Sequence, residues 1–258
     1  VRATGGGSPA SVHVSVGGLS NPTVPDTVFA AYVGAVERAV EGEDFTMVGN
    51  TTVAPPGSRM TTVSQQECER RLRHARVACL TPGMGHLAEA MATDVPVVWL
   101  PPTNPSQARQ LDLLRRYDAA PHIVAWSDVT DHPAALADPF DSPLPTVTAR
   151  INGLLRLLAA DGAARDILTS CVRERVRAAR AAPADRERRD RVLRSLRAGA
   201  VPLQRTAQEF LHDTAAAQTL RLGADLRVLL IGARDFAIPH RALLALQAHV
   251  PGLSRPTP

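Results

Sequence analysis

Residues 76–107 constrain the fold more than any other part of the chain. Val77–Leu80 is a short apolar run, which is typical of a buried parallel strand. Glycine and proline interrupt this run at 81–85, and helix-forming residues follow at 86–92. A second apolar run at 95–100 ends at a pair of prolines. Strand, helix and strand in this order predict a β-α-β unit whose helix covers one face of a parallel sheet.

The residues of chemical interest lie in the turns that follow these two strands. Gly83 and Gly85 precede the helix, where free backbone N–H groups and the helix dipole favour a phosphate. Glu89 lies one turn into the helix, within reach of a ribose diol, and Asn104 and Gln107 can hydrogen-bond sugar hydroxyls. Ligands of parallel sheets bind at the carboxyl ends of the strands, so the pattern predicts a nucleotide-sugar site. Glycines needed only for tight turning would give the same pattern.

The order of these residues resembles a known family. Gly-x-Gly-x-x-x-Glu-Ala, followed by Pro-Val-x-x-x-Pro and Asn-x-x-Gln, is similar to the donor-binding, C-terminal half of nucleotide-sugar glycosyltransferases with the two-Rossmann-domain (GT-B) fold. The resemblance covers roughly residues 10–125. It implies that the glycine turns face the diphosphate, the glutamate holds the ribose, and the carboxamides hold the sugar. The implied donor-binding residues are Gly17, Gly18, Asn21, Gly83, Met84, Gly85, His86, Glu89, Asn104 and Gln107.

Two stretches, 100–107 and 15–22, are also similar to cytosylglucuronate and hydroxymethylcytosylglucuronate synthases of nucleoside-antibiotic pathways. This closer resemblance implies UDP-glucuronate as the donor and a cytosine as the acceptor. The Asp-Gln pair that is common in the wider family is replaced by Asn104-Pro105-Ser106-Gln107, so the pattern does not define the sugar. His86 has three interpretations: a contact to phosphate or sugar, an ordinary first-turn residue or, least favoured, a general base.

Composition excludes several classes of function. The chain has 258 residues, 45% of them hydrophobic, and a net charge of +4, which suits an anionic ligand. Its basic residues are all Arg, which excludes a Walker A lysine and a Schiff-base lysine. The three cysteines show no C-x-x-C spacing, which favours a reducing cytoplasm and a core role for Cys79. No run is long enough to span a membrane.

The predicted class is α/β, with a Rossmann-like parallel sheet and an Arg-rich helical extension. The expected organisation is a linker at 1–10, a donor-nucleotide-binding domain at 11–127, a Pro- and Asp-rich linker at 128–146, helices at 147–222 and a terminal strand–helix unit at 223–258. Within the nucleotide domain we expect strands at 11–16, 45–48 and 122–126, and helices at 27–40, 65–74 and from 107 to about 117. Asp26 is the expected cap of the first helix.

The predicted function is therefore transfer of a sugar from a UDP-sugar to a small acceptor. The design requires no cofactor and no metal, and the sequence has no Asp-x-Asp motif. The resemblance implies an acceptor domain before this chain, which would carry any catalytic base, so we expect a fragment. The alternatives are a sugar-nucleotide epimerase, a non-catalytic nucleotide-binding module, or a nucleic-acid-binding protein. Acidic residues among the arginines favour solvated helix faces over nucleic acid.

Overall fold

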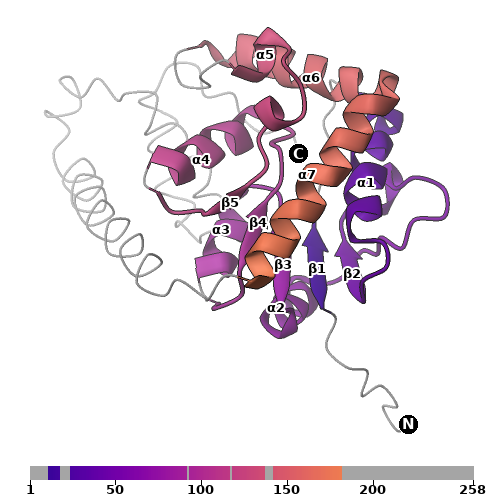
Figure 1. Ribbon diagram of the computed structural model, residues 1–258, viewed down its shortest axis with the longest axis vertical. Coiled ribbons are helices and arrows are strands. Elements are labelled where there is room, and N and C mark those ends of the chain that lie inside the picture. Colours follow the sequence, from indigo (N-terminus) through magenta and orange to yellow (C-terminus); the bar gives the residue numbers. More distant parts are fainter. Residues whose placement is uncertain (1–10, 18–23, 92, 117, 137–141, 182–258) are drawn as a thin grey trace, which may run out of the picture. The chain divides into compact units, whose positions relative to one another are not determined.

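A five-stranded parallel sheet forms the centre of the computed structural model, which describes residues 11–17, 24–91, 93–116, 118–136 and 142–181 (Figure 1). The sheet order is β2-β1-β3-β4-β5. The strands are β1 (Val12–Ser15), β2 (Phe45–Val48), β3 (Val77–Leu80), β4 (Val97–Trp99) and β5 (His122–Ile123). All four pairings are parallel, so the carboxyl ends of the strands meet at one edge. The predicted α/β, Rossmann-like class is confirmed.

Helices connect and cover the strands. They are α1 (Asp26–Val40), α2 (Gln65–His74), α3 (Met84–Met91), α4 (Pro105–Arg116), α5 (Pro133–Leu136), α6 (Leu144–Ala160) and α7 (Gly162–Ala181), with short 3-10 turns η1 (Thr51–Val53) and η2 (Trp126–Asp128). The predicted bounds of β2, α2 and β3 are confirmed. No helix in the described ranges is both long and apolar enough to cross a membrane.

The sheet has two different faces, and β1 shows the difference. Val12, Val14 and the following Val16 belong to the main core with α1 and α7. His13 and Ser15 point to the opposite face, where they lie beside polar atoms of α2 and α3. Side chains alternate along a strand, so one face of β1 is apolar and the other carries polar groups that are equally buried.

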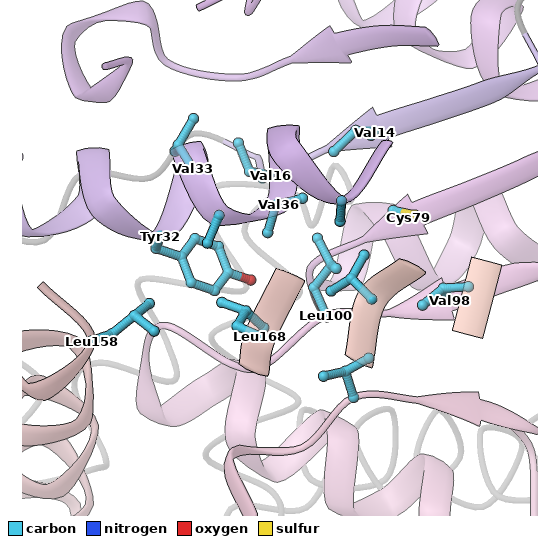
Figure 2. Packing of buried hydrophobic residues seen from close by; sticks show 14 of the residues in the cluster. Val14, Val16, Tyr32, Val33, Val36, Cys79, Val98, Leu100, Leu158 and Leu168 are labelled. Carbon is cyan, nitrogen blue, oxygen red and sulfur yellow. The ribbon is translucent and has the colours of Figure 1, made fainter. Parts of the chain in front are cut away.

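The main core lies between the sheet and the helices α1, α6 and α7. Figure 2 shows Tyr32, Val33 and Val36 of α1 among side chains of the sheet, with Leu158 and Leu168 from the two C-terminal helices. In Figure 1, α7 runs across the sheet beside α1. The hydroxyl of Thr169 lies 3.0 Å from the carbonyl oxygen of Ala35, which joins α7 to α1.

The segment predicted as a linker, 128–146, contains helical structure. α5 lies within it, and α6 begins at Leu144 rather than at 147. Pro145 stands in the first turn of α6, where proline removes no hydrogen bond, so it does not interrupt the helix. The linker at 1–10, the terminal unit at 223–258 and the extension beyond 181 lie outside the described residues.

Two helix starts also differ from the predictions. Asp26 is the first residue of α1, and Pro25 occupies the cap position without a side-chain hydrogen bond. α4 begins at Pro105, earlier than expected, because the Asn104 side chain accepts a hydrogen bond of 2.9 Å from the Gln107 backbone N–H. Asn104 therefore acts as the cap of this helix.

Candidate functional site

Two turns lie side by side at the carboxyl edge of the sheet. The first follows β1 and includes Gly17, whose φ of +69° favours glycine. The second follows β3 and leads through Thr81 and Gly83 into α3. A Cβ atom on Gly17 would lie 3.6 Å from both His86 Cε1 and Thr81 Oγ1, so the two turns are in van der Waals contact range. Gly18 and Asn21 lie outside the described residues.

Neither glycine of the second turn is required by the surrounding structure. Neither Gly83 nor Gly85 has a positive φ. A Cβ atom on Gly83 would come no closer than 3.9 Å to its neighbours, and a Cβ atom on Gly85 would meet nothing within 4 Å. The alternative that these glycines serve only tight turning therefore has no support in backbone geometry or packing. Their effect is to leave open space over the start of α3.

The start of α3 brings backbone N–H groups that lack a helical acceptor to that space. The helix has eight residues, and the Leu87 N–H donates to the Gly83 carbonyl oxygen at 2.8 Å. The amides of the three preceding residues, 84–86, point out of the helix end without a helical acceptor. Together with the helix dipole they favour an anionic group.

The imidazole of His86 is hydrogen-bonded through both nitrogens. Nδ1 lies 2.7 Å from the carbonyl oxygen of Thr81, which can only accept, so Nδ1 carries the proton. Nε2 lies 2.8 Å from the Ser15 hydroxyl. Burial lowers the pKa of His86, although the bond to the Thr81 carbonyl acts in the opposite direction. The ring is thus neutral, and neither nitrogen is left to donate to a phosphate or a sugar.

A second histidine extends this polar contact away from the edge. His13 is fully buried, with Nδ1 3.0 Å from the Thr46 hydroxyl and Nε2 3.7 Å from Cys68 Sγ. The same thiol lies 3.9 Å from the Ser15 hydroxyl. Burial is the main cause that lowers the pKa of His13 to about 4, and the neighbouring Arg71 and His86 act in the same direction.

Cys68 and His13 are the residue types of a nucleophilic cysteine–histidine dyad, but their pKa values do not favour the thiolate that such a dyad needs. Burial and the nearby Glu89 carboxylate raise the pKa of the Cys68 thiol. Since the pKa of His13 is lowered, both groups are neutral near pH 7, and the reactive thiolate does not form. We conclude that these residues connect the sheet to α2 and do not form a catalytic centre.

Glu89 brings an unsatisfied acceptor to the same region. Its Oε2 atom is buried and has no hydrogen-bond partner. Burial and the carboxylate of Glu69 raise the pKa of Glu89. A buried acceptor without a donor is destabilising, and a ligand hydroxyl would satisfy it.

The third turn, between β4 and α4, is held by two aromatic side chains. The Tyr32 hydroxyl donates to the Pro101 carbonyl at 3.0 Å, and Trp126 Nε1–H donates to the Pro102 carbonyl at 2.8 Å. Both bonds are buried. The turn therefore presents the start of α4 at a defined position beside the carboxyl edge.

The side-chain oxygens of Asn104 and Gln107 are used inside this third turn. Gln107 Oε1 accepts from the backbone N–H and the hydroxyl of Thr103, at 2.8 and 2.9 Å. Asn104 Oδ1 caps α4. The groups that these two residues still offer to a ligand are their amide N–H donors.

Several residues that build the site were not singled out from the sequence. They are Ser15, Tyr32, Cys68, Thr81, Thr103 and Trp126. One signal was present: His13 and Ser15 alternate with valines in a strand that a parallel sheet buries on both faces. Polar residues in such a strand indicate a buried polar layer. The remaining residues carry no local signal.

A small cavity borders the third turn at Pro102. Its volume is about 90 Å³, which is small beside the ~300 Å³ or more of typical ligand pockets. Its lining is mostly apolar and includes Pro102 and Trp126, with Asp112, Arg115 and Arg150 as charged members. Among the described residues, no three His, Cys, Asp or Glu side chains are grouped to hold a metal ion.

Comparisons with known proteins identify distant structural similarity and no family. No protein-family model matches the sequence, and no curated protein is significantly similar to it. Similar solved structures include CalG4, the calicheamicin glycosyltransferase, with 17% identity over 67% of this chain and a TM-score of 0.33. The glycotransferase of kitacinnamycin has 20% identity over 75% of this chain and a TM-score of 0.29.

The aligned parts are only portions of those proteins. This chain spans 39% of the first and 46% of the second, which is less than half of either length. At such low identity and TM-score, neither likeness bears on the activity of this chain.

Proposed function

We propose that this chain is the donor-nucleotide-binding part of a glycosyltransferase. The observation that carries the proposal is the open space at the start of α3. Gly83 and Gly85 leave this space open, although neither packing nor backbone geometry requires a glycine at either position. The first N–H groups of α3 have no acceptor within the helix, and the turn at Gly17 lies beside the helix start. An anionic diphosphate fits this arrangement.

The neighbouring groups suit the rest of a nucleotide sugar. The buried Oε2 atom of Glu89 lacks a donor, and a ribose hydroxyl would supply one. The amide N–H groups of Asn104 and Gln107 would donate to oxygens of the sugar. Met84 contributes its backbone N–H to the diphosphate.

The proposed reaction is attack by an acceptor on the anomeric carbon, with UDP as the leaving group. Negative charge grows on the diphosphate as the glycosidic bond breaks, and fixed backbone donors stabilise it. His86 is not the base in this scheme, because both ring nitrogens are already hydrogen-bonded. A base and the acceptor site would lie outside the described residues.

The narrower proposal is UDP-glucuronate as donor and a cytosine as acceptor. It rests on the resemblance of residues 15–22 and 100–107 to cytosylglucuronate synthases. Amide donors at Asn104 and Gln107 are chemically suited to a sugar carboxylate, which only accepts hydrogen bonds.

Calorimetric titration with UDP, UDP-glucuronate, UDP-glucose and ADP tests the proposal. We expect UDP to bind in preference to ADP, and glucuronate to improve binding over glucose. Equal binding of the two UDP-sugars would remove the glucuronate assignment and keep the nucleotide site. A folded sample that binds none of them would contradict the proposed function.

The rival functions give different results in related assays. An epimerase would convert a UDP-sugar without any acceptor, which product analysis would detect. A non-catalytic module would bind UDP and never transfer sugar when candidate acceptors are supplied. Salt-sensitive DNA binding that UDP leaves unchanged would favour the nucleic-acid alternative.

A further inference from the structure

One histidine takes part in the contact between the two glycine turns, beside the bond of 3.1 Å from the Thr81 N–H to the Ser15 carbonyl oxygen. The His86 ring lies between Gly17 and the Thr81 backbone, and Ser15 at the end of β1 holds its far nitrogen. Ser15 is almost fully buried, so no water replaces its hydroxyl easily. The ring therefore spans from the first turn to the second.

The protons in this contact can be assigned from the acceptors. The Thr81 carbonyl has no proton to give, so His86 Nδ1–H donates to it. The neutral ring then has a lone pair at Nε2, and the Ser15 hydroxyl donates to that lone pair. This is the Nδ1–H form of histidine, with Nε2 unprotonated.

The same reasoning assigns the protons of the Cys68 thiol and of His13. The Ser15 proton is committed to His86, so Ser15 Oγ accepts from the Cys68 thiol. The Cys68 sulfur then accepts from His13 Nε2–H, and His13 Nδ1 accepts from the Thr46 hydroxyl. In this series of hydrogen bonds, each group donates one proton to the next, from the Thr46 hydroxyl to the Thr81 carbonyl. Hydrogen bonds that run in one direction strengthen one another.

We propose that Ser15 and His86 are a positioning pair that holds the two glycine turns at the spacing needed for the nucleotide diphosphate. This inference rests on the proposed function. His86 acts through the turns and does not contact the ligand with its nitrogens. Two histidines in opposite neutral forms, Nδ1–H at His86 and Nε2–H at His13, are the signature of the arrangement.

The first test uses nitrogen-15 NMR of the histidine side chains in the unaltered chain. Two-bond proton–nitrogen correlations distinguish the two neutral forms of imidazole. We expect a protonated Nδ1 at His86 and a protonated Nε2 at His13. An Nε2–H form at His86 overturns the proposal, whether or not any nucleotide binds.

The second test measures UDP affinity in variants. Ser15→Ala removes the donor to Nε2, and we expect UDP binding to weaken by about tenfold. Ser15→Thr keeps the hydroxyl and should restore most of the affinity. Thr169→Val is the matched control, because it removes a buried hydroxyl that bonds between α7 and α1, and its UDP affinity should stay unchanged.

The outcomes separate this inference from the proposed function. If the unaltered chain binds UDP and Ser15→Ala binds equally well, the positioning role is wrong and the nucleotide site stands. If Thr169→Val weakens binding as much as Ser15→Ala, the effect is general destabilisation, and the positioning role is again wrong. If the unaltered chain does not bind UDP, both the proposed function and the positioning role fail, while the NMR result still decides the protonation.

Discussion

Gly49 and Gly85 both lie near the carboxyl edge of the sheet, but their surroundings differ. A Cβ atom on Gly49 would come within 2.6 Å of Val16 Cγ2 and 2.7 Å of Met60 Sδ. The same atom on Gly85 would meet nothing within 4 Å. Packing therefore explains Gly49, whereas neither packing nor backbone conformation requires a glycine at position 85.

The substitution Gly85→Ala separates stability from binding at this residue. Alanine favours the helix, so we expect the free energy of unfolding to rise by up to about 1 kcal/mol. The new methyl group occupies the space over the amides of α3, so UDP binding should weaken. Urea unfolding and calorimetric titration measure the two effects. Unchanged UDP affinity would show that this space is not used by the nucleotide.

Gly49→Ala is the control for this substitution, since it makes the same chemical change at a crowded position. It should lower the free energy of unfolding by about 1–3 kcal/mol, because the Cβ atom must displace a neighbouring side chain.

His13 makes stability depend on pH. Its pKa is lowered from 6.5 to about 4 by burial, so between these values the unfolded chain binds a proton that the folded chain does not. Above about pH 6.5, His13 therefore does not reduce the free energy of unfolding. As the pH falls from 6.5 toward 4, the free energy of unfolding decreases. We expect a loss of about 3 kcal/mol over this interval, measured by urea unfolding at several pH values.

The variant His13→Asn tests the source of that loss. Asparagine does not titrate, so the dependence of stability on pH should become shallower even if the variant is less stable at pH 7. His132→Asn is the comparison, because His132 is exposed in the folded protein. A slope that survives in His13→Asn would assign the pH dependence to other groups.

At the scale of elements, α4 shows how one side chain fixes the start of a helix beside the candidate site. Its cap, Asn104, satisfies the Gln107 N–H, and Gln107 in turn satisfies Thr103. Tyr32 and Trp126 donate hydrogen bonds to the carbonyl oxygens of the two preceding prolines. The start of the helix is therefore rigidly placed before any ligand binds.

Two substitutions at Asn104 distinguish capping from ligand binding. Asn104→Ala loses the cap and should lower the free energy of unfolding by about 1 kcal/mol. Asn104→Asp keeps an acceptor for the Gln107 N–H and adds a charge that suits a helix start, so stability should hold. The same variant has no amide N–H donors, so affinity for a UDP-sugar should fall. If Asn104→Asp binds as well as the original chain, Asn104 serves the helix alone.

At the scale of the whole described region, the helices that follow the sheet complete its core. α7 packs on α1, although Thr169 and Ala35 are separated by 134 positions in the sequence. Without residues 144–181, the face of the sheet that packs on α1 would lose the cover that α6 and α7 provide. These helices are therefore part of the same folded unit as the carboxyl edge of the sheet.

Neighbouring residues of α7 test this dependence. Leu168 is fully buried and Ile167 is 44% exposed. We expect Leu168→Ala to lower the free energy of unfolding by about 2–5 kcal/mol, because it leaves a cavity against α1. Ile167→Ala should change it by less than about 1 kcal/mol. Equal effects of the two substitutions would contradict the packing of this helix.

Local pattern determined the strands, the crossover helices and the turns at Gly83 and Asn104. Apolar runs, helix-forming residues and prolines act over a few neighbours, so the bounds of β2, α2 and β3 follow from them. The pattern also located the carboxyl edge, because parallel strands end on one side. It misplaced the start of α6, where Pro145 fits the first turn of a helix.

Tertiary structure alone decided which side chains meet at that edge. Ser15 and His86 are 71 positions apart, and His13 and Cys68 are 55 apart, so no short-range pattern records their contacts. The open space at Gly85 and the crowding at Gly49 likewise depend on atoms from other elements. The sequence determines the local conformation that a residue favours. The protonation of His86 and the missing donor of Glu89 depend on neighbours that only the folded chain supplies.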